Sequence, residues 1–318
     1  MTRDEVLNSI QLKKRFCKDC GLPITVFENP YFYERLSILD VQFDCIKKFN
    51  TFCAELMPFD CEQEYFEYYN SVKDEIITYI RNNPTYQKFN IATFDKQKLQ
   101  IDKRNLYIEP NDGGRFISVD MKKANFSAMN YYSPLIFMAD TWEKFIGKYT
   151  SSQHIINSKY IRQVILGACN PRQQTRYENC LMSTLCKHII DSFRDSLHVY
   201  SLGEDEIIIT IKNSNEDINP PLDFSLKKFR KVLNSCPSGI SQLVRIEMFD
   251  LYKLDNIGWM KVDCNGARGV EFKCVDGEIY HQVIKHFFNV PIIEDDLVVY
   301  HNGRLAKFLE QIGNPFCG

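Results

Sequence analysis

Apolar residues recur every three or four positions in three segments of the first 95 residues, which is the period of a helix that buries one face. The pattern predicts helices over residues 2–18, 40–57 and 61–81. In the third segment, the apolar face consists of Tyr65, Tyr69, Val72, Ile76 and Tyr79. We expect this helix to stop at Asn83, because a proline follows it. No catalytic pattern is visible in this region.

A two-residue alternation appears after Lys96, as expected for strands. The short runs LQI and LYI lead through the turn EPNDGG to RFISVD, an apolar strand that ends on Asp120. Residues 197–211, LHVYSLGEDEIIITI, predict two strands joined by an acidic turn. Between these strands the helical period returns, and it predicts helices over 122–132, 141–149, 158–166 and 172–193.

The last third of the chain combines both patterns. A polar linker with Pro220 and Pro221 is followed by a short predicted helix, by strand-like runs between 243 and 275, and by two final helices. The chain is therefore predicted to be an α+β protein. We expect three regions: a mostly helical N-terminal region over 1–95, a domain with an antiparallel sheet and packed helices over 96–275, and a C-terminal helical extension over 276–318.

Composition places the chain among ordinary globular proteins. With 318 residues, of which 44% are hydrophobic and 25% charged, it can build one large domain or two smaller ones. The formal net charge of -2 gives no overall attraction for nucleic acid, so local groups of Lys and Arg would have to hold such a partner. The richness in Phe, Tyr and Asn suggests an AT-rich genome, such as that of a virus.

The 12 cysteines favour a reducing, cytoplasmic compartment, because their spacing does not repeat as it does in a disulfide scaffold. Cys17 and Cys20 form a CxxC pair, but a structural zinc site needs a second pair. The N-terminus is too charged for a secretion signal, and no window approaches the roughly 18 apolar residues of a membrane span. We therefore expect a non-secreted protein without membrane contact.

Two groups of acids stand at the ends of predicted strands. Asp120 ends the run RFISVD, and Glu204, Asp205 and Glu206 occupy the turn of the later hairpin. Taken alone, Asp120 fits the N-cap of the following helix, and acids in a hairpin turn keep their water at little cost. Taken together, the acids can converge on one end of a sheet, where carboxylates hold the divalent cations of phosphoryl or nucleotidyl transfer.

The segments that carry these acids resemble the motifs of palm-domain nucleic-acid polymerases. VDMKKANFSA resembles motif A in its reverse-transcriptase form, and YSLGEDEIII resembles motif C. Asp205 follows Asp120 by 85 residues (205 minus 120), and NPRQQTRYENCLMSTL between them resembles motif B. The resemblance covers about residues 96–275 and implies a polymerase-like palm, in which Asp120 and Asp205 hold catalytic Mg²⁺ (or Mn²⁺) with support from Glu206.

The acidic turn departs from the reverse-transcriptase pattern, since Gly-Glu-Asp-Glu stands where Tyr-x-Asp-Asp is usual. It is also similar to the Asp-Glu of bacterial repair polymerases, to the Gly-Asp-Asp of RNA-directed RNA polymerases and to the hairpin of GGDEF cyclic-dinucleotide synthases. Asp205 is an acid in each register, so we assign it as the principal second ligand and Glu204 as a solvent-facing alternative. Motif B has Arg172 and Gln173 in place of the usual Gln-Gly.

The resemblance also suggests which residues contact substrate. Asn125 stands five residues after Asp120, where reverse transcriptases commonly have an aromatic residue that collides with a ribose 2′-hydroxyl; Phe126 follows it. Since Asn can donate to and accept from that hydroxyl, we expect a pocket for ribonucleotides. Positive charge for a triphosphate would come from Lys122, Lys123, Arg162, Arg172 and Arg176, although the ordinary role of each is to keep a helix face hydrated.

These residues predict a nucleotidyltransferase, and foremost a template-directed polymerase that adds nucleotides to a nucleic-acid 3′-end by a two-metal mechanism. Its partners would be nucleic acid and nucleoside triphosphates, and additional protein subunits could strengthen its binding to the template. Two alternatives stay open. One is a template-free nucleotidyltransferase or nucleotide cyclase on the same palm, and the other is a non-catalytic scaffold, derived from a palm, that binds nucleic acid or protein.

Overall fold

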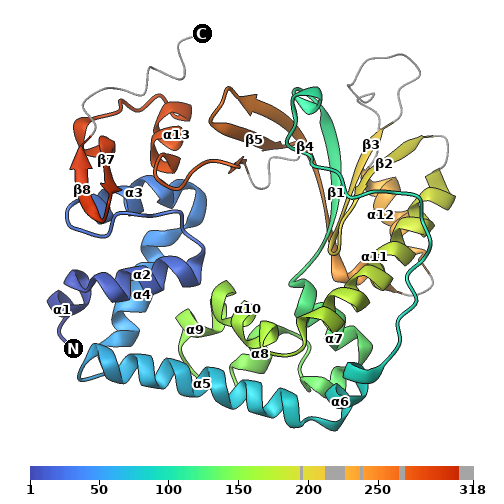
Figure 1. The fold of residues 1–318 in the computed structure, drawn as a ribbon, viewed down its shortest axis with the longest axis horizontal. Coiled ribbons are helices and arrows are strands. Elements are labelled where there is room, and N and C mark those ends of the chain that lie inside the picture. Colours follow the sequence, from blue (N-terminus) through green and yellow to red (C-terminus); the bar gives the residue numbers. More distant parts are fainter. Residues whose placement is uncertain (194–195, 212–225, 237–238, 265–268, 308–318) are drawn as a thin grey trace.

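The computed structural model describes residues 1–193, 196–211, 226–236, 239–264 and 269–307, so the predicted linker with Pro220 and Pro221 lies outside the described residues. Within these ranges the chain combines helices with an antiparallel sheet, which confirms the predicted α+β class. The helices and the sheet follow one another around an open ring, with the sheet at the upper right of Figure 1 and the N-terminal helices on the left.

The larger sheet has six strands in the order β2-β3-β1-β4-β5-β6, and all neighbours are antiparallel. The strands are β1 Arg115–Met121, β2 Leu197–Leu202, β3 Glu206–Ile211, β4 Val244–Leu254, β5 Gly258–Asp263 and β6 Val270–Lys273. Helix α11 (Pro171–Phe193) is the last of several helices between β1 and β2, and α12 (Leu226–Asn234) lies between β3 and β4. The first four strands with these two helices therefore form a split βαβ arrangement, with β1 in the centre.

Side chains of β1 alternate between a helix-covered face and an open face of the sheet. Ile117 and Val119 are fully buried and pack with Ile207 and Ile209 of β3 beneath α11 and α12, which Figure 1 shows along one side of these strands. Because successive strand residues point in opposite directions, Asp120 lies on the other face. Apolar residues cover part of that second face: Leu106, Phe116, Ile208, Phe249, Leu251 and Trp259.

Most other described residues of the chain belong to helices that share one core. The α-helices are α1 Arg3–Asn8, α2 Ile10–Cys20, α3 Tyr31–Phe43, α4 Cys45–Leu56, α5 Glu62–Asn82, α6 Pro84–Ile91, α7 Ala124–Tyr132, α8 Trp142–Ile146, α9 Gln153–Asn157, α10 Lys159–Gly167 and α13 Tyr280–Phe287. Short 3₁₀ helices span Glu109–Asn111, Pro134–Ile136, Ile240–Leu243 and Glu294–Leu297. One cluster of buried side chains runs from Val6 to Ile284, so the expected region boundary at 95 does not separate two cores.

The N-terminal helices are shorter and more numerous than the apolar period predicts. The helix expected over 2–18 divides at Ser9, whose hydroxyl accepts a hydrogen bond from the Leu12 backbone N–H at 3.1 Å and so caps α2. The helix expected over 40–57 divides at Asp44, which has a left-handed backbone (φ 47°). Pro84 begins α6 instead of a loop, because the first turn of a helix does not need the N–H that proline lacks.

The end of the described chain contains a hairpin where a second helix was expected. Strands β7 (Val298–His301) and β8 (Arg304–Lys307) pair around Asn302 and Gly303, whose φ angles are 50° and 75°. Asn-Gly favours these positive angles, which a tight hairpin turn requires. The runs LQI and LYI, by contrast, form no strand; Leu106 instead packs over the sheet beside Phe116.

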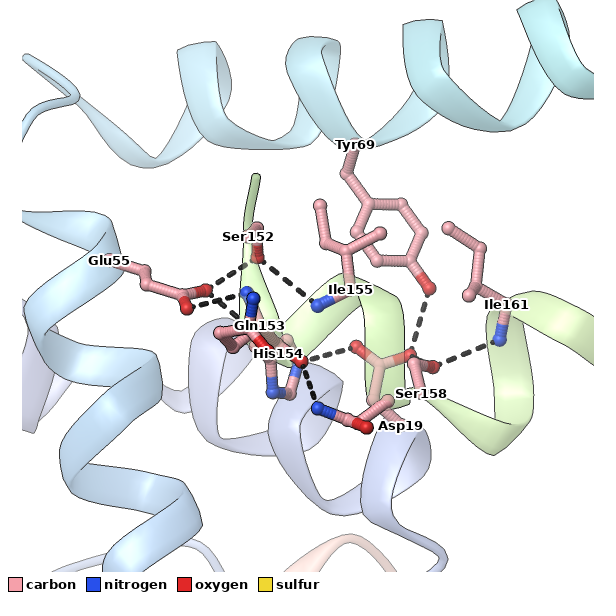
Figure 2. Close-up of polar contacts among 10 residues, drawn as sticks. Asp19, Glu55, Tyr69, Ser152, Gln153, His154, Ile155, Ser158 and Ile161 are labelled. Carbon is pink, nitrogen blue, oxygen red and sulfur yellow. Dashed lines mark hydrogen bonds and ion pairs between the residues drawn. The ribbon is translucent and has the colours of Figure 1, made fainter. Parts of the chain in front are cut away.

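A buried carboxylate joins N-terminal helices to helices that follow later in the chain (Figure 2). Asp19 of α2 is fully buried, and it accepts hydrogen bonds from the hydroxyls of Tyr69 and Ser158, each at 2.8 Å. Nε2 of His154 lies 3.0 Å from its other oxygen. These partners come from α5, from α9 and from the residue that caps α10, so one side chain connects four helices. Buried charges persist only when they are satisfied in this way.

We predict that Asp19→Ala lowers the free energy of unfolding by about 3 to 5 kcal/mol, since it leaves three polar partners in a dry interior without their acceptor. Urea denaturation measures this change. Asp74→Ala is the matched control, because the Asp74 side chain on α5 is 67% exposed, and it should stay within about 0.5 kcal/mol of the parent. A loss below about 1 kcal/mol for Asp19→Ala would show that the contacts of Asp19 do not stabilise the fold.

Candidate functional site

Strand register brings the predicted acids to one end of the sheet. Asp120 of β1 stands directly opposite Glu206 of β3, in a ladder that also pairs Val119 with Ile207. The Met121 backbone N–H donates to the backbone carbonyl of Asp205 at 2.8 Å, so the hairpin turn lies beside the end of β1. Directly opposed residues of antiparallel strands have neighbouring side chains on the same face. Strand pairing therefore places Asp120 opposite Glu206, with Asp205 in the adjoining turn.

The turn between β2 and β3 is closed by backbone contacts and leaves its acids toward solvent. The Gly203 N–H donates to the Glu206 carbonyl at 2.8 Å, and a Cβ atom at Gly203 would come within 3.3 Å of that same oxygen. Glu204 forms an ion pair with Lys103 at 2.8 Å, and a hydrogen bond from this ammonium lowers the pKa of Glu204. Asp205 at the turn is exposed.

Asp120 and Glu206 each contact a polar partner on the open face of the sheet. Nε of Arg245, which stands opposite Asp120 on β4, lies 2.7 Å from the Asp120 carboxylate, and the Ser118 hydroxyl donates to Glu206 at 2.5 Å. Burial raises the pKa of Asp120 to about 6, Arg245 opposes the rise, and the charges of Glu206 and Asp205 add to it. The acids are thus close enough to repel one another, a condition that favours the binding of a cation.

Glu178 of α11, which is not among the predicted site residues, lies near enough to the acidic turn to be influenced by the charges of Asp205 and Glu204. Its side chain is 4% exposed, and the Asn125 amide donates to its carboxylate at 3.0 Å. Burial raises the pKa of Glu178 to about 7, with further contributions from Asp205 and Glu204 and opposition from the Asn125 hydrogen bond. A sequence signal existed, because Glu178 stands at helical spacing between buried residues of α11, where an acid is unusual.

Asn125 and Phe126 lie in different surroundings. Asn125 is in the first turn of α7, only a short turn after Asp120, and its contact with Glu178 holds it near the acidic hairpin. Phe126 is 4% exposed and packs against Phe137 and Trp142 in the helical core. The structure therefore pairs Asn125 with Glu178 of α11 and places the Phe126 ring in the interior.

The predicted basic residues divide into two groups. Lys123 forms an ion pair with Glu143, whose charge also opposes the lowering of the Arg162 pKa that burial causes. These two cations thus share one acid. The other three are exposed: Lys122 lies after β1, and Arg172 and Arg176 lie on the first turns of α11.

The chemistry of the acids fits Mg²⁺, although they do not form a complete cage. Within the described ranges, no group of three or more His, Cys, Asp or Glu side chains is arranged so that it could hold a metal ion. Mg²⁺ commonly takes only one or two protein carboxylates and completes its shell with water and substrate phosphates. Asp120 and Glu206 are two such oxygen donors on rigid, adjacent strands, and their mutual repulsion with Asp205 is what a divalent cation would relieve.

Comparisons with protein-family models, with curated proteins and with solved structures find no match for this chain. Across the described residues, no helix has both the length and the apolar character needed to cross a membrane.

We predict that Glu178→Gln stabilises the protein at pH 8 and has little effect at pH 4.5. The raised pKa of Glu178 means that the folded state holds this proton more tightly than the unfolded state does. The resulting stability is fully present below the ordinary pKa of Glu and is lost as the pH rises to about 7. Gln can still accept from Asn125 and never ionises, so the expected gain at pH 8 is about 1 to 3 kcal/mol.

Urea denaturation of both proteins at the two pH values measures this difference. Glu67→Gln, at an exposed position of α5, serves as the charge-matched control and should give equal stability differences at both values. If Glu178→Gln were no more stable than the parent at pH 8, ionisation of Glu178 would cost the folded protein no stability. That result would contradict the raised pKa of Glu178.

Proposed function

We propose that the protein is a metal-dependent nucleotidyltransferase, and specifically a template-directed polymerase that adds nucleotides to a nucleic-acid 3′-end. The observation that carries the proposal is the direct opposition of Asp120 and Glu206 on β1 and β3, with Asp205 in the adjoining turn. Three carboxylates at one end of a sheet would destabilise the fold if their role were purely structural, because their charges repel.

The surrounding fold supports this proposal. The motif-A-like segment forms the central strand and the start of α7, and the motif-C-like segment forms the hairpin that pairs with it. The motif-B-like segment forms α11, which packs behind the same strands. An antiparallel sheet covered by helices on one face is the arrangement that the resemblance to polymerase palms implies.

Each residue of the site has a defined part in the proposed reaction. Asp120 and Glu206 supply fixed carboxylate oxygens from paired strands, and Asp205 adds a third from the exposed turn. Bound Mg²⁺ would make a 3′-hydroxyl more acidic and offset charge on the departing pyrophosphate. Ser118 orients Glu206 through its hydrogen bond, which keeps one carboxylate oxygen directed along the sheet.

Asn125 is proposed to face the sugar of the incoming nucleotide. Asn125 follows Asp120 by five residues, and its amide donates a hydrogen bond to Glu178, which restricts the rotamers of the side chain. An amide in this position can hydrogen-bond a ribose 2′-hydroxyl. The substrates would then be ribonucleoside triphosphates.

We predict that the protein incorporates labelled nucleotides into a primer-template with Mg²⁺ or Mn²⁺, and that Asp120→Asn lowers the rate at least about a hundredfold, since it removes a charge that acts on the transition state. Glu206→Gln should lower the rate in the same direction. Asp255→Asn is the matched control: Asp255 is an exposed acid at the far end of β4 with a left-handed backbone that Asn also adopts.

The products of the same assay distinguish the alternatives. Extension of the primer according to the template supports the proposal. Cyclic or short products without template would assign the site to a template-free nucleotidyltransferase or cyclase. Absence of turnover in the parent protein, with nucleic-acid binding that Asp120→Asn leaves unchanged, would assign the protein to the non-catalytic scaffolds.

We further predict a preference for ribonucleotides over deoxyribonucleotides that falls about tenfold in Asn125→Ala, because one hydrogen bond to the 2′-hydroxyl is lost. The ratio of kcat/KM for the two sugars measures the preference, so a general loss of activity cancels. Asn130→Ala, later on α7, is the control and should leave the ratio unchanged. A parent protein that used only deoxyribonucleotides would contradict the assignment of Asn125.

A further inference from the structure

Arg245 connects the candidate site to a row of charges that crosses the open face of the sheet. Its Nε lies 2.7 Å from the nearer Asp120 oxygen and 3.6 Å from Glu247, two residues farther along β4. Glu247 in turn pairs with Lys261 of β5 at 3.1 Å. The row therefore alternates in sign from Asp120 through Arg245 and Glu247 to Lys261.

The two ends of this row differ in exposure and in packing. Lys261 and Glu247 are both 13% exposed at their side chains, and the Lys261 ammonium lies 4.2 Å from the centre of the Phe249 ring, which restricts its movement. The Arg245 side chain is 43% exposed, whereas that of Asp120 is 21% exposed. A long and half-exposed side chain can leave one partner at small cost. Glu247 is the second acceptor within its reach.

Arg245 and a divalent cation would both bind the carboxylate of Asp120. The guanidinium sits against Oδ2 of that carboxylate, and a metal ion bound to the same oxygen would bring two positive charges into contact with it. Both cations relieve the repulsion among Asp120, Glu206 and Asp205, and at the same carboxylate they would repel each other at short range. The binding of each cation to Asp120 is therefore expected to weaken the binding of the other.

We propose that Arg245 is an internal counter-ion that competes with the divalent cation for Asp120. This inference rests on the proposed function, since it concerns the same metal site. Arg245 holds Asp120 in place while no metal is bound and moves toward Glu247 when a cation arrives. Free metal consequently binds weakly, and the site fills efficiently only when substrate phosphates contribute further oxygen ligands.

The test is a titration of the full-length protein with Mn²⁺, in which the electron paramagnetic resonance signal of free Mn²⁺ reports the unbound fraction. We expect Arg245→Gln to bind Mn²⁺ about fivefold more tightly than the parent, as removal of a half-exposed ion pair allows. Arg245→Lys keeps the positive charge and should restore weak binding, a rescue that a merely structural role would not produce. Asp120→Asn should weaken binding in the parent and in the Arg245→Gln background.

Arg115→Gln is the matched control for total charge. Arg115 forms a two-pronged ion pair with Asp250 in the same β1–β4 ladder, at the opposite end from Asp120. Its replacement removes one positive charge from the same sheet without touching the acids, so Mn²⁺ affinity should equal that of the parent. An equal gain of Mn²⁺ affinity in Arg115→Gln and Arg245→Gln would show that the change in net charge alone explains the effect, and it would overturn the proposal.

The remaining outcomes separate the inference from the proposed function. If the parent binds Mn²⁺ through Asp120 and Arg245→Gln binds it no more tightly, Arg245 does not compete and the inference is overturned, while the metal site stands. If neither protein binds Mn²⁺ in a manner that depends on Asp120, the proposed metal-dependent function is overturned and the inference with it.

Discussion

The pairing of β1 with β3 is the constraint on which the candidate site depends. Ile117 and Val119 must face the helices, because apolar side chains of this size are costly to leave in water. The alternation of a strand then sends Asp120 to the opposite face, and the buried Ile207 of β3 fixes Glu206 beside it in the same way. A slip of one residue would bury the carboxylate and expose the isoleucine. Hydrophobic burial thus fixes the acids in positions where their own charges oppose one another.

Much of this arrangement could be predicted from local patterns. Asp120 stands at the end of an apolar run, and Asp205 and Glu206 stand where the second strand of a hairpin begins, so their positions near strand ends follow from the period of the sequence alone. Arg245 could not be found in this way, because its contact with Asp120 depends on β4 being the other neighbour of β1, and a local pattern contains no information about strand order. Glu178 could have been identified from the sequence, because it is an acid within the apolar stripe of a long helix.

The helical region shows a second limit of local patterns. The apolar period located α5 and α11 well, since both are long helices with one apolar face. It merged α3 with α4, because it does not report the left-handed residue that separates them. It also suggested a boundary near residue 95, whereas a single core continues past that position. Whether two helices share a core depends on contacts between distant segments, which the spacing of apolar residues within each helix does not encode.

The buried carboxylate of Asp19 also bears on the order in which the chain folds. Its partners His154 and Ser158 lie 135 and 139 positions later. While the chain emerges from a ribosome, Tyr69 of α5 is made early, but the other two partners of this carboxylate are missing until α9 and the start of α10 have also been made. All the partners of Asp19 are therefore present only after about half of the polypeptide has been made, and we expect the N-terminal helices to complete their native packing at that stage.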